Sequence, residues 1–292
     1  MRLKMFLLYL VCSIFILGGI IPQASAQDKM QFDAVYGQGD QVLRIATGSP
    51  GSLGLLKEIG LPFCRENDCR IKWLKRGSGA SLQALKDGQV DVVLVHAPQA
   101  EQEAVEQGWA TGRTLLGSNQ FYIVGPASDP AKIRTADSVA KAYAMIAKAK
   151  APFFSRADNS GTHKKEMHIW ELAGIEPEGE WYKKTHDFMG PTLMQADKRS
   201  GYFMTDSSTF VVKEARLENL AVLFKDDPIL INVYHALMGN PQELPGTNDA
   251  LARKFLRHIG FGPGQAAYRS FGLEQYGQPL YKDAFEAQKY HE

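Results

Sequence analysis

The stretch that decides the fold is Ala151 to Ala173, which reads APFFSRADNSGTHKKEMHIWELA. The apolar run at its start predicts a buried strand, and the residues from Thr162 to Ala173 predict a helix. Between the two, Gly161 and several hydroxyl or amide side chains can turn the chain and cap the free N–H groups of the first helical turn. A strand that passes into a helix through such a loop is the repeating unit of an α/β layer.

The same unit recurs along most of the chain. Further strands are expected at residues 42–47, 71–76, 91–98, 113–118, 121–126, 201–205, 220–224 and 231–239. Further helices are expected at residues 52–59, 80–86, 98–107, 139–150, 207–216, 248–259 and 265–271. Strands and helices that alternate at this spacing favour right-handed parallel crossovers.

The alternation predicts an α/β fold of two lobes with a ligand cleft between them. We expect residues 38–122 and 237–292 to form lobe 1, and residues 123–236 to form lobe 2. The runs FYIVGP and INVYHALMG are the two segments expected to cross between the lobes. In such folds, ligands bind where the carboxyl ends of strands and the amino termini of helices face a crevice.

The amino terminus has the pattern of a secretory signal peptide. Arg2 and Lys4 precede an apolar run over residues 6–21, and residues 24–26 (ASA) have the small-x-small spacing of a cleavage site. A retained membrane anchor is the alternative. Removal of residues 1–26 lowers the formal charge from +1 to −1. A chain with so small a net charge has no overall electrostatic field that would attract nucleic acid. We therefore expect an exported protein of the periplasm.

Two cysteines, Cys64 and Cys69, remain after this cleavage. An even number of cysteines in an exported protein favours a disulfide. The alternative is a metal site, which typically has C-x-x-C spacing and further Cys or His ligands, whereas here the turn-forming residues REND separate the pair. We expect a disulfide between a helix and a strand, and neither a metal site nor a cofactor.

Three loops that follow strands share glycine and hydroxyl residues, at 46–52, 76–81 and 156–162. Each of them could be only a turn with a helix cap. Together, they place backbone N–H groups and the positive ends of helix dipoles where a small anion could bind. Lys164 and Lys165 support this interpretation, because two lysines in a first helical turn are unfavourable unless a negative charge lies nearby.

Arg156 strengthens the case for an anion site. Its guanidinium is planar, permanently charged and suited to a tetrahedral oxyanion. The alternative is an ion pair with Asp158, which we otherwise interpret as a turn residue. Tungstate and molybdate are fully ionised near neutral pH, so a site of donors alone serves them, whereas phosphate keeps a proton and favours an added carboxylate acceptor.

Several segments, in this order, resemble the periplasmic tungstate-binding proteins of ABC importers: VDVVLVHAPQAE, SRADNSGTHKKE, FMGPTLMQAD and GYFMTDSSTF. The resemblance covers nearly all of the mature chain. It implies a type II periplasmic-binding-protein fold that closes on one oxyanion, tungstate or molybdate, and an ABC permease of the inner membrane as partner. It also implies a protein without enzymatic activity, which we expect to be a monomer.

The resemblance also implies the site residues. The arginine and threonine that contact the anion in that family fall on Arg156 and Thr162. The family's first loop, TTTS, is ATGS here, so two hydroxyl groups are missing and the choice among anions stays open. Its GTG loop is GSG here. The predicted ligand-binding residues are Thr47, Ser49, Ser78, Arg156, Ser160, Gly161 and Thr162.

Three other functions fit parts of the sequence. Zinc capture would use the histidines, but His163 and His168 are five apart and do not share a helix face. An enzyme could use Ser160 or Ser78 as nucleophile with His163 as base, although no G-x-S-x-G elbow is present. The same fold could also serve as a sensor or as a carrier for another small anion or organic acid. His96 is expected to end a strand and to bond locally rather than to contact the ligand.

Overall fold

A computed structural model describes residues 30–291, so the predicted signal peptide lies outside the described residues. From Phe32 onward the chain forms one compact unit. Within residues 30–291, no helix has the length and apolar character needed to cross a membrane.

The elements alternate along the chain as the sequence predicts. The strands are β1 (Ala34–Gly37), β2 (Gln41–Thr47), β3 (Cys69–Lys75), β4 (Val92–Val95), β5 (Ala110–Pro126), β6 (Phe153–Ser155), β7 (Tyr182–Lys184), β8 (Tyr202–Asp206), β9 (Leu220–Phe224), β10 (Ile231–Gly239) and β11 (Lys282–Asp283). The helices are α1 (Ser49–Ser52), α2 (Leu55–Asn67), α3 (Ser78–Lys86), α4 (Pro98–Glu106), α5 (Val139–Ala149), α6 (Gly161–Leu172), α7 (Met189–Lys198), α8 (Ser207–Lys213), α9 (Asp249–Gly260), α10 (Gly264–Ser270), α11 (Leu273–Tyr276) and α12 (Ala284–Ala287).

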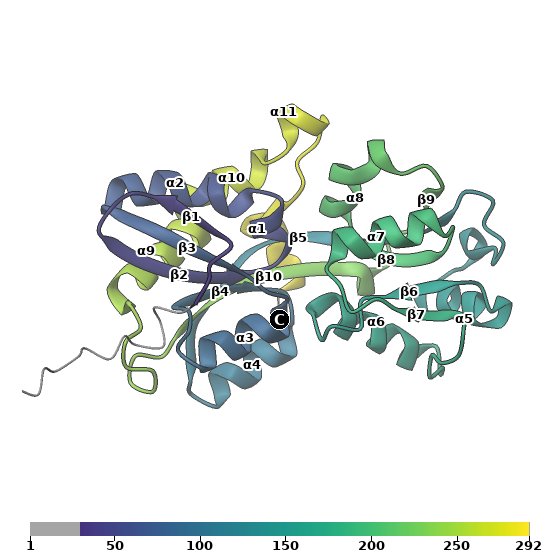
Figure 1. The fold of residues 1–292 in the computed structure, drawn as a ribbon, viewed down its shortest axis with the longest axis horizontal. Coiled ribbons are helices and arrows are strands. Elements are labelled where there is room, and N and C mark those ends of the chain that lie inside the picture. Colours follow the sequence, from purple (N-terminus) through teal and green to yellow (C-terminus); the bar gives the residue numbers. More distant parts are fainter. Residues whose placement is uncertain (1–29, 292) are drawn as a thin grey trace, which may run out of the picture. The chain divides into compact units, whose positions relative to one another are not determined.

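Two hydrophobic cores divide these elements (Figure 1). The first lobe, built from β1 to β4, α1 to α4, α9 and α10, surrounds a core that includes Phe63, Ile71 and Phe255. The second lobe, built from β6 to β9 and α5 to α8, surrounds a core that includes Phe153 and Trp170. The α/β class is confirmed, while the residue boundaries expected for the lobes stay a prediction.

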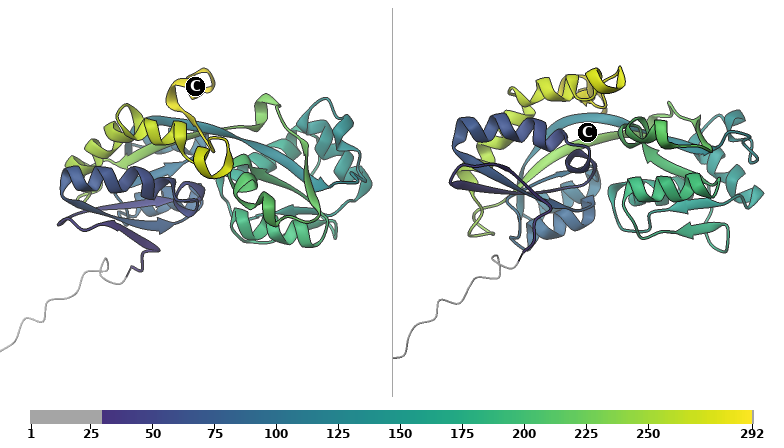
Figure 2. Two further views of the ribbon diagram at one scale, coloured as in Figure 1. Left: turned by 90° about the horizontal axis from the view of Figure 1, so that it is seen from above. Right: turned by 45° about the horizontal axis from the view of Figure 1, so that its top comes forward.

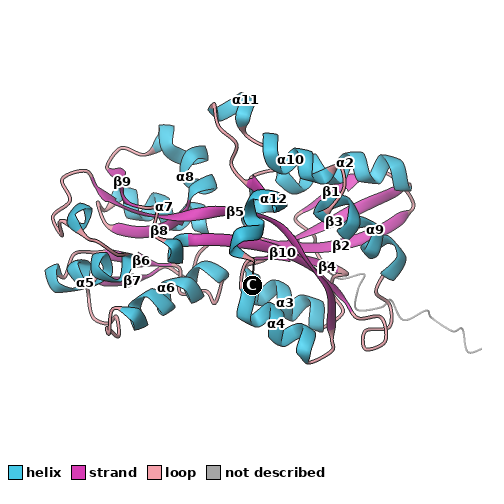
Figure 3. Cartoon of the chain, turned by 180° about the vertical axis from the view of Figure 1, so that it is seen from behind, coloured by secondary structure: helices cyan, strands magenta, loops and turns pink. Residues whose placement is uncertain are grey.

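The long strands β5 and β10 connect the two lobes. The strand order is β1-β3-β2-β4-β10-β5-β8-β6-β7, in which β2 pairs in parallel with β3 and β4, and β6 with β7 and β8. β10 pairs antiparallel with both β4 and β5, and the two long strands run side by side in both views of Figure 2. On the face shown in Figure 3, α12 packs against β5.

The structure differs from the sequence prediction in a few elements. β5 is one strand of 17 residues, although two runs, 113–118 and 121–126, were expected. The helix expected at 52–59 is instead the short α1 followed by α2, which continues past Pro62 to Asn67. The sequence pattern does not predict β1, β7, β11, α7, α11 or α12. The three strands have two to four residues, which is too few for alternation to be recognised.

The predicted disulfide is confirmed. Cys64 lies near the end of α2 and Cys69 is the first residue of β3, and the two are bonded. Both side chains are buried in the first core. Asp68 turns the chain between them with a φ of 45°, in the left-handed region. The bond therefore fixes the connection from a helix to a strand, between the predicted anion loops at 46–52 and 76–81 in the sequence.

Glu166 is a buried carboxyl group in α6, at the second core. Its Oε1 accepts hydrogen bonds from Oη of Tyr182 at 2.6 Å and from Nε1 of Trp170 at 3.3 Å. Its Oε2 is buried and finds no partner among the described residues. Burial is the main cause that raises the pKa of Glu166 from 4.5 to about 7.

This raised pKa predicts a pH-dependent stability. The folded chain holds the proton of Glu166 more tightly than the unfolded chain, so the free energy of unfolding falls as pH rises from 4.5 through about 7. Between pH 5 and pH 8, we expect Glu166 to remove roughly 2 to 3 kcal/mol. Glu166→Gln keeps an acceptor for Tyr182 and does not titrate, so urea unfolding of this variant should lack that part of the decrease. An equal decrease in both proteins would contradict the assignment.

Candidate functional site

The loops after β3, β4 and β6 meet between the two lobes, where α3 and α6 begin (Figure 1). A Cβ atom added to Gly79 would lie 2.6 Å from the carbonyl oxygen of Asn159. A Cβ atom added to Gly161 would lie 2.6 Å from both the imidazole ring and the carbonyl oxygen of His96. A side chain at either position would force the lobes apart, so glycine is needed here for close approach of the backbone.

A cavity of about 320 Å³ opens beside these contacts, with walls from both lobes. The first lobe contributes Ser49, Ser78 and His96, and the second contributes Arg156 and the first turn of α7. Three cationic side chains line it, those of Lys75, Arg156 and Lys213. Among the described residues that line the cavity, none carries a carboxylate.

Arg156 is fixed in place by its neighbours. The side chain is almost completely buried, and its Nε donates to the carbonyl oxygen of Asp187 at 3.2 Å. Its Nη2 donates to Oδ2 of Asp158 at 2.5 Å, and Oδ1 of the same carboxylate accepts the N–H of Ser160 at 3.2 Å. The expected ion pair with Asp158 is therefore present, and it orients the guanidinium. Nη1 makes no hydrogen bond to another residue of the described chain, so its hydrogens are available to a ligand.

The hydroxyl groups of Ser78 and Ser160 are arranged as donors for a ligand. Oγ of Ser78 accepts the backbone N–H of His96 at 3.2 Å, and Oγ of Ser160 accepts the backbone N–H of His163 at 3.2 Å. Neither hydroxyl donates to another of the described residues, so each hydrogen is available to a ligand. Oγ1 of Thr162 is buried and has no partner within residues 30–291.

Thr47 and Ser49 differ from these residues in how their hydroxyl groups are used. Oγ1 of Thr47 donates to the carbonyl oxygen of Leu94 at 2.8 Å, so its hydrogen is engaged within the first lobe. Oγ of Ser49 donates to Oδ2 of Asp206 over a long 3.4 Å. Thr209 also donates to Asp206, through its N–H and its hydroxyl, both at 2.8 Å. Of the predicted ligand residues, Ser49, Ser78 and Arg156 line the cavity, whereas Thr47, Ser160, Gly161 and Thr162 do not.

Helix amino termini add further donors. Gly161 and Thr162 are the first residues of α6, which has no acidic residue in its first turn and is capped by Ser160. The first turns of α3 and α7 line the cavity, so their unpaired backbone N–H groups are close to it. The sequence analysis did not identify α7 as part of the site. The signal that could have found it is Gly190-Pro191, because proline is favoured in the first turn of a helix.

His96 bonds locally, as expected, but its ring also belongs to the site. Its backbone N–H donates to Ser78, while the ring lines the cavity. Nδ1 is buried and has no partner among residues 30–291. Burial is the main cause that lowers the pKa of His96 to about 4, and the charge of Arg156 acts in the same direction. The ring is therefore neutral near pH 7.

Two observations concern the side chains named for zinc capture and for nucleophilic catalysis. For zinc, no group of three or more Cys, His, Asp or Glu residues within 30–291 is placed to hold a metal ion. For nucleophilic catalysis, Nδ1 of His163 faces the N–H of Asn159 at 3.1 Å, so this nitrogen does not face the Ser160 hydroxyl.

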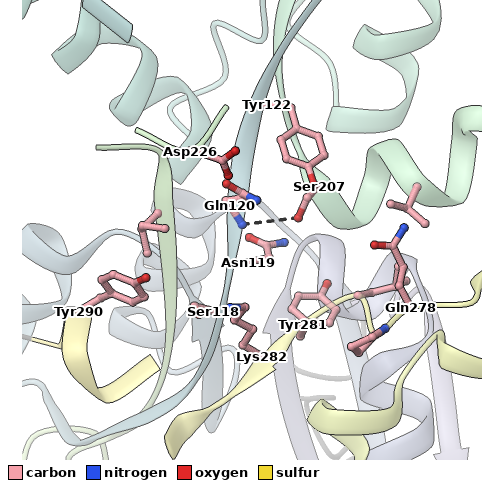
Figure 4. A pocket seen from close by; sticks show the side chains of 14 residues that line it. Ser118, Asn119, Gln120, Tyr122, Ser207, Asp226, Gln278, Tyr281, Lys282 and Tyr290 are labelled. Atoms are coloured by element: carbon pink, nitrogen blue, oxygen red, sulfur yellow. Dashed lines mark hydrogen bonds between the residues drawn. The ribbon is translucent and has the colours of Figure 1, made fainter. Parts of the chain in front are cut away.

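A second cavity, of about 430 Å³, lies where β5 meets the carboxyl-terminal segment (Figure 4). Its walls include Asn119, whose amide is already bonded to Ser208 and Asn232. The walls also include the carboxylate of Asp226 and the ammonium group of Lys282. The Lys282 ammonium is already paired, because it lies 3.3 Å from the carboxylate of Glu286. This cavity therefore suits a small anion less well than the one beside Arg156.

Comparison with known proteins shows the family of the chain. Residues 32–259 match the PBP superfamily domain. The chain is 33% identical over 260 residues to the tungstate-binding protein TupA of Peptoclostridium acidaminophilum, with 88% of this chain and 90% of that protein covered.

Two solved structures are similar over most of the chain. The tungstate ABC transporter structure from Geobacter sulfurreducens is 34% identical with a TM-score of 0.71, covering 79% of this chain and 98% of that one. The tungstate-binding protein TupA from Desulfovibrio alaskensis G20 is 36% identical with a TM-score of 0.69, covering 84% and 99%. The predicted type II periplasmic-binding-protein fold is thus confirmed, and the chain belongs to the PBP superfamily and, within it, to the family of the tungstate-binding protein TupA.

Proposed function

We propose that the mature chain is a periplasmic solute-binding protein that captures tungstate or molybdate and delivers it to an ABC permease. The observation that carries this proposal is the cavity between the lobes, which three cationic side chains line without a carboxylate. A fully ionised dianion accepts hydrogen bonds through every oxygen, so a site made of donors matches it. The names of the relatives support the same ligand class.

The proposed ligands are Arg156, Ser78, Ser160 and Thr162, together with the N–H of Gly161. Roughly six charge-assisted hydrogen bonds of about 1.5 to 3 kcal/mol each supply about 9 to 18 kcal/mol before costs. A nanomolar complex requires about 12 kcal/mol, so micromolar to nanomolar affinity is attainable after the costs of association. Ser49 joins this set if its hydroxyl turns from Asp206 to the anion. We propose no catalytic step and a monomeric chain.

Isothermal titration of the purified mature protein with tungstate, molybdate, sulfate and phosphate tests the proposal. We expect stoichiometric binding of tungstate or molybdate, and weaker binding of phosphate because its proton meets only donors. A thermal-shift screen provides the comparison. If a small carboxylate raises the melting temperature while tungstate and molybdate leave it unchanged, the fold serves another anion and the proposal is wrong.

Ser78 and Thr47 provide a matched pair of substitutions. Ser78→Ala removes a hydroxyl whose hydrogen is free, so tungstate affinity should fall about 10- to 150-fold, which corresponds to one hydrogen bond to a charged ligand. Thr47→Val removes a hydroxyl whose hydrogen is already bonded to Leu94. This variant should lose about 1 kcal/mol of stability and keep its affinity within about threefold. Titration and thermal unfolding of both variants check the prediction, and equal losses of affinity would refute it.

A further inference from the structure

Two buried polar atoms without partners lie on opposite sides of the closed contact between the lobes. They are Nδ1 of His96 in the first lobe and Oγ1 of Thr162 in the second, and neither has a hydrogen-bond partner among residues 30–291. Gly161 lies next to both residues. It precedes Thr162 in the chain, and a Cβ atom on it would lie 2.6 Å from Nδ1 of His96. Most buried polar atoms in native proteins are paired, so an unpaired atom on each side of the Gly161 contact indicates a missing partner.

We propose that His96 is a direct ligand of the bound oxyanion and donates its Nδ1–H to it together with the hydroxyl of Thr162. The assignment rests on the function proposed above. The backbone N–H of His96 donates to Oγ of Ser78, which is itself a proposed ligand. The main chain of His96 therefore positions one ligand of the first lobe, and its ring supplies a second. The donor is new to the site, because neither the sequence motifs nor the family resemblance assigns this histidine.

The surroundings of the ring favour a fixed donor. Its centroid lies 5.0 Å from that of Tyr234 and 6.2 Å from that of Phe121, so aromatic packing limits its rotation. The ring is neutral near pH 7, so only one of its two nitrogens carries a hydrogen. The Asn232 side chain also bonds to the ring, so a hydrogen on Nδ1 requires the Asn232 amide to donate to Nε2. A ligand that accepts hydrogen bonds selects the tautomer with the hydrogen on Nδ1. The donor therefore favours a fully deprotonated oxyanion over one that carries a proton on the facing oxygen.

Three substitutions at His96 separate ligand binding from packing. The amide nitrogen of Asn can occupy the position of Nδ1, that of Gln reaches the position of Nε2, and Phe keeps the aromatic packing without a donor. We expect tungstate affinity to stay within about tenfold for His96→Asn and to fall further, by about 10- to 150-fold, for His96→Gln and His96→Phe, as for the loss of one charge-assisted hydrogen bond. Thermal unfolding confirms that each variant folds.

Nitrogen-15 NMR of the wild-type imidazole provides a readout that packing alone would not change. Addition of tungstate should shift the Nδ1 signal to that of a protonated, hydrogen-bonded nitrogen. Equal affinity in the wild type and all three variants, equal losses in all three, or an unchanged Nδ1 signal on saturation would overturn the assignment while leaving tungstate binding established. Absence of tungstate binding by the wild type would instead refute the proposed function and the assignment with it.

Discussion

Arg156→Ala should reduce tungstate affinity by about 150- to 25,000-fold and leave the fold intact. The guanidinium is almost completely buried beside the cavity, and its Nη1 hydrogens are free for the ligand. Losing two charge-assisted hydrogen bonds removes about 3 to 6 kcal/mol of binding free energy. The substitution also leaves the carboxylate of Asp158 without its cation, close to where the anion binds. Isothermal titration measures the affinity, and circular dichroism confirms the fold.

Two variants serve as controls for Arg156→Ala. Arg76 lies in the loop after β3 and is exposed, and its guanidinium donates to the carbonyl oxygen of Lys75. Arg76→Ala therefore removes the same charge without removing a proposed ligand. Its affinity should stay within about threefold, as is usual for an exposed charge. Arg156→Lys keeps the charge but loses the planar fork, so an intermediate affinity is expected. Near wild-type affinity in Arg156→Ala would show that this arginine does not bind the ligand.

Gly161→Ala should reduce tungstate affinity about 100-fold or more, although alanine is the better helix former. The added Cβ atom would lie 2.6 Å from the ring and the carbonyl oxygen of His96, and a backbone carbonyl cannot move aside as a flexible side chain can. The lobes would then stay apart, and at least two hydrogen bonds of about 1.5 to 3 kcal/mol would be lost from one lobe. The helix itself gains from the substitution, so weakened binding cannot be attributed to α6 unfolding.

Gly190→Ala provides the matched control, since Gly190 also lies in the first turn of a helix at the cavity. A Cβ atom there meets only Cε of Lys213, at 3.5 Å, and this side-chain end is flexible. We expect its affinity to stay within about threefold of the wild type, because the contact is an ordinary van der Waals one. If titration shows that both alanine variants bind as tightly as the wild type, the contact between Gly161 and His96 does not control closure.

The sequence predicted those parts of the site that local chemistry determines. The loop from Arg156 to Thr162 carries its own cap, turn residues and cation, so its strand, loop and helix pattern could be recognised without tertiary information. The loops at 46–52 and 76–81 have a similar pattern of glycine and hydroxyl residues, which predicted further helix amino termini and the hydroxyl of Ser78 as donors. The disulfide could be predicted because only two of the three cysteines lie outside the predicted signal peptide.

The remaining features depend on contacts between distant residues. The ring of His96 belongs to the site because Gly161, 65 positions later in the chain, packs against it. The hydroxyl of Thr47 is bonded to Leu94 on the neighbouring strand, and no local pattern shows where that hydrogen is directed. Pro62 lies within α2, where the helix is packed on the first core, so tertiary burial outweighs the local preference against proline.

Anomalous diffraction at the tungsten absorption edge, from crystals of the mature protein with tungstate, tests the central claim most directly. It locates the metal atom without reference to affinity. We predict one strong peak between the lobes, with oxyanion oxygens within hydrogen-bond distance of Nη1 of Arg156, Oγ of Ser78 and Oγ1 of Thr162. A peak in the cavity beside Asn119 and Lys282, or at any place from which these three atoms point away, would contradict the account.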